Sequence, residues 1–103
     1  GLWGKTSCFE YDARVPLIFA GPGVAAGKGT PALAELIDLF PTLAGLCRLP
    51  QPPGLDGADL SPVLADPAKP GKPAAFTQHP RPAYFDRTPA GVPEAMGYSV
   101  RTA

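Results

Sequence analysis

Few side chains of this sequence belong to the types that carry out catalysis, and they are widely spaced. The single histidine is His79, and the two cysteines are Cys8 and Cys47. Neither cysteine belongs to a C-x-x-C pair, so these three residues do not form a zinc-binding pattern. The sequence also contains no G-x-S-x-G, no H-E-x-x-H and no complete G-x-x-x-x-G-K-[ST] motif. Residue types and spacing alone therefore reveal no complete catalytic constellation.

The charge balance narrows the classes of partner. Nine basic and nine acidic residues give a formal net charge of zero. Nucleic acids and anionic membranes both select for an excess of basic residues. No apolar run approaches the roughly 20 residues that span a bilayer. We therefore expect neither nucleic acid nor a membrane as a partner.

Proline and glycine dominate the composition and limit the size of the core. The 15 prolines and 12 glycines make up about a quarter of the chain, and they cluster between apolar runs, as is typical of loops. The few elements that remain would build a thin core. The chain begins at Gly1 without an initiating methionine and ends directly after a strand-like run. We interpret it as a segment that completes its core against the rest of a longer protein.

The middle of the chain predicts one short helix. Apolar residues between 31 and 49 recur at three- and four-residue intervals. Pro41 inside a longer helix would cost about 3 kcal/mol, because it removes a hydrogen bond and clashes with the preceding turn. A helix over 39–46 avoids that cost, since Pro41 then lies in the first turn. Asp38 would be its N-cap, and 34–37 would be extended. One continuous, kinked helix is the alternative.

The other predicted elements are strands and one helical turn. The apolar run at 15–20, closed by Gly-Pro-Gly, is typical of a buried strand. Residues 1–12 and the proline-rich stretch 50–73 are expected to be loops, with a turn of helix at 61–64. Residues 74–78 are a further candidate strand. Residues 97–102 alternate between apolar and polar, which is typical of a half-exposed strand.

Several longer stretches resemble one known family and follow its order along nearly the whole chain. They are G-L-W-G-K-T-S at 1–7, R-V-P-L-I-F at 14–19, L-I-D-L-F-P-T-L at 36–43, G-L-D-G-A-D-L-S-P-V-L at 54–64, Q-H-P-R-P at 78–82 and M-G-Y-S-V-R-T at 96–102. The fourth stretch departs from the family pattern, because Asp59 stands where Ser is usual. This combination resembles the sulfatase family of the alkaline-phosphatase-like superfamily, and most of all its iduronate-2-sulfatase group.

The resemblance implies a fold class and a division into domains. The expected fold is part of an alkaline-phosphatase-like α/β sulfatase, with a buried strand, a short helix, proline-rich loops and C-terminal antiparallel strands. Residues 1–49 would be the end of the catalytic α/β domain, 50–73 a connecting loop, and 74–103 the start of the C-terminal subdomain. The implied function is hydrolysis of sulfate esters, including those of sulfated sugars. The 103 residues are expected to be inactive without the remainder of the sulfatase chain.

The resemblance also implies the chemistry of the site. Family members use a formylglycine made within a C/S-x-P-x-R motif, and a calcium ion. Neither cysteine is followed by x-P-x-R, so the nucleophile and the calcium ligands are expected outside this chain, which supplies no metal ligand. Lys5 is expected to contact the sulfate, where a fixed ammonium can stabilise charge moving toward the leaving group. Thr6 and His79 are expected to contact the substrate.

Other polar residues receive structural interpretations. Arg81 and Arg101 have the bidentate geometry that binds carboxylate or sulfate, but surface ion pairs are the favoured interpretation. Both cysteines are expected to be ordinary free thiols, with a disulfide between them as the alternative in an oxidising compartment.

Two other functions stay open. One is a related phosphoester or phosphonate hydrolase, and the other is a non-catalytic, proline-rich interaction module. The family suggests a secreted, periplasmic or lysosomal protein, and a cytoplasmic location stays open as well.

Overall fold

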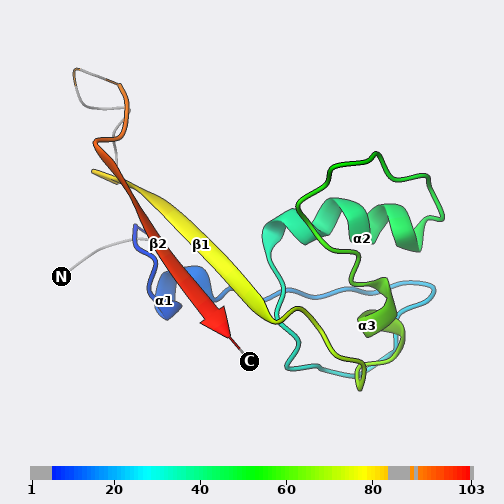
Figure 1. Cartoon of the computed structure of the whole chain (residues 1–103). Coiled ribbons are helices and arrows are strands. Elements are labelled where there is room, and N and C mark those ends of the chain that lie inside the picture. Colours follow the sequence, from blue (N-terminus) through cyan, green and yellow to red (C-terminus); the bar gives the residue numbers. More distant parts are fainter. Residues whose placement is uncertain (1–5, 84–88, 90, 103) are drawn as a thin grey trace. The chain divides into compact units, whose positions relative to one another are not determined.

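The computed structural model describes residues 6–83, 89 and 91–102. These residues form two compact units. The hairpin unit comprises the described residues within 1–17 and 76–101, and the helical unit comprises 18–75. Along the chain the elements are as follows (Figure 1): α1 (Glu10–Ala13), the 3₁₀ helix η1 (Leu36–Asp38), α2 (Leu39–Leu46), α3 (Ser61–Ala65), β1 (Ala74–Arg81) and β2 (Ala95–Thr102). None of the described helices has the length and apolar character needed to cross a membrane.

Helix α2 confirms the predicted helix over 39–46, with Pro41 fully buried in its first turn. Its C-terminus closes with two hydrogen bonds, from Arg48 N–H to Gly45 O at 3.0 Å and from Leu49 N–H to Ala44 O at 2.9 Å. These are the two bonds of a Schellman motif, which requires a left-handed residue after the helix. Arg48 takes that conformation, with φ of 55°. The chain therefore turns sharply out of α2 into the proline-rich stretch.

The predicted role of Asp38 as the side-chain cap of α2 is wrong. Its carboxylate makes no capping bond to α2. Instead, it accepts hydrogen bonds from the backbone N–H of Glu35 at 2.8 Å and from that of Ala58 at 2.7 Å. The bond to Glu35 belongs to a capping box that starts η1. Residues 36–38 are consequently a 3₁₀ turn rather than the extended lead-in that the position of Pro41 predicts.

Thr42 joins α2 to the segment that precedes α3. Its hydroxyl oxygen accepts a hydrogen bond from Leu60 N–H at 2.9 Å, and its O–H donates to Ala58 O at 3.5 Å. Thr42 is fully buried, so these bonds satisfy a hydroxyl that has no access to water. Helix α3 begins where this segment ends and confirms the helical turn predicted at 61–64. The remainder of 50–73 is loop, as predicted.

In the hairpin unit, β1 and β2 pair as a two-stranded antiparallel sheet. Both strands are longer than the sequence predicts, and the fold is a small α/β piece rather than a complete sulfatase domain. The N-terminal segment, predicted to be loop, contains the single turn α1. It is held against the hairpin by side-chain hydrogen bonds to backbone groups. The division into 1–49, 50–73 and 74–103 stays a prediction.

The predicted buried strand at 15–20 is wrong for the described residues. None of these residues lies in a strand, and Ile18 is 87% exposed. A strand forms only where a neighbouring strand satisfies its backbone N–H and C=O groups. The described part of the chain places no such neighbour beside this segment, so its apolar side chains remain in solvent.

The core is small, as the composition predicts. Among the described residues the buried apolar side chains are Pro41, Ala44, Leu60 and Val63, and all four belong to the helical unit. Large apolar side chains are exposed in both units, including Phe40, Leu49, Phe76, Tyr98 and Val100. Such a core contributes little hydrophobic stabilisation, so polar contacts to the backbone decide how the loops are held.

A close approach of two backbone segments in the helical unit generates the first prediction. A Cβ atom on Gly57 would overlap the carbonyl group of Ile37, which is backbone and cannot rotate away. Gly57→Ala should therefore destabilise the fold by about 2–3 kcal/mol, measured by urea denaturation. Gly29→Ala is the matched control, because nothing lies within 4 Å of a Cβ there. Equal stability of the two variants would contradict this packing.

Candidate functional site

Of the three predicted site residues, Lys5 lies outside the described residues, whereas Thr6 and His79 lie in the hairpin unit. Thr6 is half-buried, and both of its backbone polar groups are bound. Its N–H donates to Asp12 Oδ2 at 3.0 Å, and its carbonyl oxygen accepts from Arg81 Nη1 at 2.8 Å. The residue next to Lys5 is thus held by two charged side chains of opposite sign.

The turn of α1 brings Asp12 back toward Thr6. The N–H of Asp12 donates to Phe9 O at 2.9 Å, which closes this turn. The Asp12 carboxylate then also accepts from Ser7 Oγ at 2.6 Å, and Ser7 is buried. The same Ser7 oxygen accepts from Phe9 N–H at 3.3 Å. A short network of local bonds therefore shapes the segment that follows Lys5.

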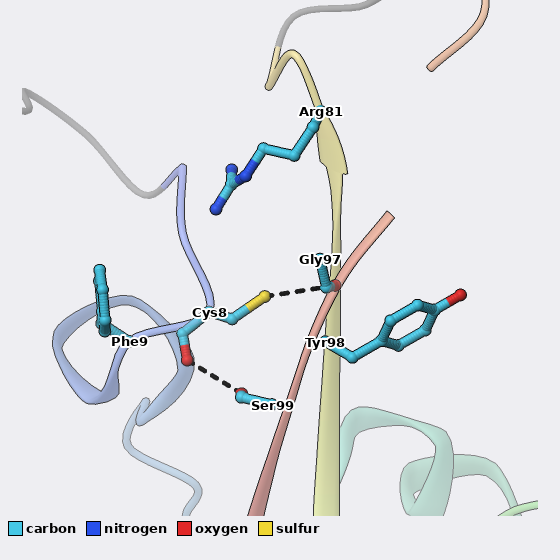
Figure 2. Close-up of a pocket in the computed structure, with 6 residues that line it drawn as sticks. All are labelled: Cys8, Phe9, Arg81, Gly97, Tyr98 and Ser99. Carbon is cyan, nitrogen blue, oxygen red and sulfur yellow. Dashed lines mark hydrogen bonds between the residues drawn. The ribbon is translucent and has the colours of Figure 1, made fainter. Parts of the chain in front are cut away.

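Strand β2 holds the next residue of this segment, Cys8 (Figure 2). The Ser99 hydroxyl donates to Cys8 O at 2.9 Å, and the Cys8 thiol donates to Gly97 O at 3.5 Å. Cys8 and Cys47 are both free thiols, which confirms the interpretation favoured by the sequence. The Cys8 thiol thus contributes to packing against β2.

A shallow hollow of about 230 Å³ lies between this segment and the strands. Figure 2 shows its lining, with the Arg81 side chain extending over it; the lining residues are Cys8, Phe9, Arg81, Gly97, Tyr98 and Ser99. Pockets that bury a small-molecule ligand usually have volumes of about 300–1,000 Å³. This hollow, formed by described residues of the hairpin unit, is smaller than that range.

His79 and Arg81 are two residues apart on β1, which places them on one face of the strand. His79 is half-buried; its Nδ1 lies 3.0 Å from Pro80 O and 3.5 Å from Arg81 Nη1. A carbonyl oxygen only accepts and a guanidinium only donates, so the two contacts require different protonation of Nδ1. The Arg81 guanidinium thus contacts both predicted substrate-binding residues, through the Thr6 carbonyl oxygen and His79 Nδ1.

Sequence reasoning missed this role of Arg81 by favouring a surface ion pair. The signal that could have found it is the two-residue spacing from His79 in Q-H-P-R-P, because residues at i and i+2 of a strand face the same way. The corresponding expectation for Arg101 is confirmed. Its Nη1 lies 3.2 Å from Glu10 Oε1, and the two side chains are 59% and 51% exposed. Such an exposed pair contributes little to stability.

The helical unit contains a second cluster of charges, formed by Glu35, Asp38 and Lys72. Lys72 Nζ pairs with Glu35 and lies 3.0 Å from Asp38 Oδ1 and 3.1 Å from Asp38 Oδ2. Asp38 is fully buried and Lys72 nearly so. The described residues contain no group of three or more His, Cys, Asp or Glu side chains arranged to hold a metal ion. Both carboxylates of the cluster pair with the Lys72 ammonium, so the three side chains form an ion network.

The environment shifts the pKa of both central members of this network. Burial raises the pKa of Asp38, but hydrogen bonds from Ala58, Glu35 and Lys72 outweigh it, and the pKa lies below its ordinary value of 3.8. Burial lowers the pKa of Lys72, but its hydrogen bonds and charge pairing with Glu35 and Asp38 outweigh it, and the pKa lies above 10.5. Both groups are charged at neutral pH.

Comparison with known proteins finds several sulfatases among the relatives of this chain. The chain is 32% identical to mouse iduronate 2-sulfatase, with 99% of the chain and 28% of the relative aligned. It is 31% identical to rat arylsulfatase K, over 95% of the chain and 17% of the relative. It is 38% identical to a Drosophila melanogaster extracellular sulfatase SULF-1 homologue, over 59% of the chain and 6% of the relative. The chain thus spans less than a third of the length of these curated relatives. No protein-family model matches it, and no solved structure matches it.

The free energy of unfolding at acidic pH should depend on the charge of Asp38. Its pKa is lowered on folding, so the stabilisation is present above pH 3.8 and is lost as pH falls below that value through the folded pKa. Asp38→Asn should destabilise the fold by about 1–3 kcal/mol at pH 7, because it removes one of the two carboxylates paired with Lys72 and the charged acceptor of two backbone N–H groups. The difference from the unmodified protein should shrink as pH falls below 4.

Urea denaturation at a series of pH values measures this difference. Asp56→Asn is the matched control, since it removes an exposed carboxylate, and it should change stability at pH 7 by less than about 0.5 kcal/mol. A destabilisation by Asp38→Asn that stays constant from pH 7 to pH 2 would contradict a charged Asp38 in the folded state.

Proposed function

We propose that this chain, which is related to the sulfatase family by sequence, supplies part of the substrate site of an enzyme that hydrolyses sulfate esters of sulfated sugars. The observation that carries the proposal is the similarity to mouse iduronate 2-sulfatase over 99% of the chain. The chain corresponds to 28% of that relative. The activity is therefore proposed for the longer polypeptide that contains these residues, with this chain contributing selected groups.

Lys5 is the proposed sulfate-binding residue. Cleavage of a sulfate ester moves negative charge toward the bridging oxygen of the leaving group. A fixed ammonium beside the sulfate stabilises that charge more than it stabilises the ground state, and this difference accelerates the reaction. The ammonium must be held in place to do so, and the bonds to both backbone groups of Thr6 support that requirement.

Thr6 and His79 are the proposed substrate-contacting residues. Both lie within hydrogen-bond reach of Arg81 through their backbone carbonyl and ring nitrogen, respectively. A hydroxyl and an imidazole can each bind sugar hydroxyls or sulfate oxygens as donors. The hollow lined in part by Arg81 is smaller than the usual volume of a ligand pocket, so we propose that the remainder of the sulfatase chain completes the pocket.

Calcium and formylglycine enter the proposal through the family alone. The described residues include no cluster suited to a metal ion, and neither cysteine lies in a C/S-x-P-x-R motif. The residues present therefore fit neither a calcium site nor a formylglycine nucleophile. We place the calcium ligands and the nucleophile in the remainder of the polypeptide.

The alternatives lack an observation in their favour. A related phosphoester or phosphonate hydrolase would also use a lysine beside a tetrahedral anion, but the relatives reported above are sulfatases by name. A non-catalytic proline-rich module would leave 50–73 without fixed contacts, whereas Leu60 and Ala58 are bonded to buried side chains of the helical unit.

Removing the ammonium tests the proposed role of Lys5. In the longer sulfatase that contains this chain, Lys5→Ala should lower kcat/KM for an aryl sulfate by about 10²–10³-fold, as for other groups that stabilise developing charge. Lys28→Ala is the matched control, because Lys28 is exposed in a loop of the helical unit and should be silent. Retention of full activity by Lys5→Ala would overturn the assignment.

The 103-residue chain by itself should show no sulfatase turnover. The proposed nucleophile and calcium ligands lie elsewhere, so the chain can bind a sulfate ester weakly at most. The measurement is release of the phenol from an aryl sulfate with calcium present, with the longer sulfatase as the positive control. Sustained turnover by the isolated chain would contradict the proposal that it supplies only part of the site.

A further inference from the structure

We infer that Arg81 and Asp12 are positioning residues that hold the backbone carrying Lys5. The inference rests on the proposed function of Lys5 and extends it. Neither residue needs to touch the substrate. Each acts by fixing a peptide group beside Thr6, and through it the place from which the lysine side chain extends.

The hydrogen bonds act on the two peptide groups that flank Thr6. The N–H of Thr6 belongs to the peptide bond that joins Lys5 to Thr6, and it donates to Asp12 Oδ2 at 3.0 Å. The carbonyl of Thr6 belongs to the following peptide bond, and it accepts from Arg81 Nη1 at 2.8 Å. Because peptide groups are planar, fixing both planes removes the main rotations of this residue. By covalent geometry, the peptide plane between Lys5 and Thr6 also includes the Cα atom of Lys5.

The chemistry of the two partners suits a positioning role. Both bonds are charge-assisted, which makes them shorter and stronger than bonds between neutral groups. The planar guanidinium of Arg81 loses little freedom when it binds. It also extends from β1, so the loop is held by a regular strand 75 residues away in sequence. Sites are held accurately when their supporting residues stand on such elements.

Further hydrogen bonds hold the two residues that follow Thr6. Ser99 of β2 donates to the carbonyl of Cys8 at 2.9 Å, two residues beyond Thr6. Asp12 also accepts from the buried Ser7 hydroxyl. The backbone from Thr6 to Cys8 is therefore held from the hairpin on one side and from α1 on the other.

A positioning role has a kinetic signature that a general structural role lacks. Misplacement of a catalytic group by about 1 Å can cost about 100-fold in rate. Arg81→Gln, which shortens the side chain and removes its charge and its guanidinium fork, should therefore lower kcat/KM by about 10–100-fold. The loss should depend on the presence of the Lys5 ammonium, because Arg81 acts through it.

The experiment is a double-mutant cycle in the longer sulfatase, with an aryl sulfate as substrate. Arg81→Gln is measured with Lys5 present and in the Lys5→Ala background. The expected result is a loss of about 10–100-fold with Lys5 and less than about 3-fold without it. Arg81→Lys, which keeps a charged donor, should recover part of the activity. Glu10→Gln breaks the exposed pair with Arg101 in the same unit and should change kcat/KM by less than about 2-fold.

Two results would overturn the inference. One is a loss of the same size in both backgrounds, which would mean that Arg81 acts independently of Lys5. The other is the absence of any loss with Lys5 present. If Arg81→Gln does not fold, Asp12→Asn replaces it in the same cycle, with an expected loss of about 3–10-fold that again vanishes without Lys5. Failure of the proposed function has a different signature, because Lys5→Ala alone would then be fully active.

Discussion

The buried carboxylate of Asp38 is the interaction on which the helical unit depends. It has no access to solvent, and it binds the backbone N–H of Glu35, the backbone N–H of Ala58 and the ammonium of Lys72. These partners come from three separate stretches of the chain. A buried charge is costly unless hydrogen bonds and an opposite charge compensate it, and here each carboxylate oxygen has partners of both kinds. One side chain therefore fixes where η1, the segment before α3 and the segment before β1 lie.

The hairpin unit follows the same principle with other residues. The segment from Thr6 to Cys8 is held by Asp12, Arg81 and Ser99, each of which forms a hydrogen bond with a backbone group of that segment. The common cause is composition. In a chain where a quarter of the residues are proline or glycine, regular helices and sheets leave many backbone groups unpaired, and buried groups of this kind need a partner. Polar side chains supply those hydrogen-bond partners. The apolar core is too small to hold the loops by itself.

Local patterns in the sequence predict the regular elements well, and contacts distant in sequence poorly. Pro41 and the apolar spacing are enough to predict α2, and the alternation at 97–102 is enough to predict β2. The strand expected at 15–20 does not form among the described residues, because a strand depends on a neighbour that the local sequence does not reveal. The part played by Asp38 was misjudged for the same reason: its bond to Ala58 spans 20 residues. The contact between Arg81 and Thr6 spans 75 residues, and no local pattern in the sequence predicts it. Lys5, Thr6 and His79 remain predictions as site residues.

We propose that this chain brings a lysine to the sulfate of a substrate held by a longer sulfatase. A crystal structure of that complete protein with inorganic sulfate bound tests it most directly. We expect a sulfate oxygen within about 3 Å of Lys5 Nζ, with the Thr6 carbonyl still bound to Arg81. A sulfate ion bound in the catalytic pocket with the Lys5 side chain turned away into solvent would contradict it.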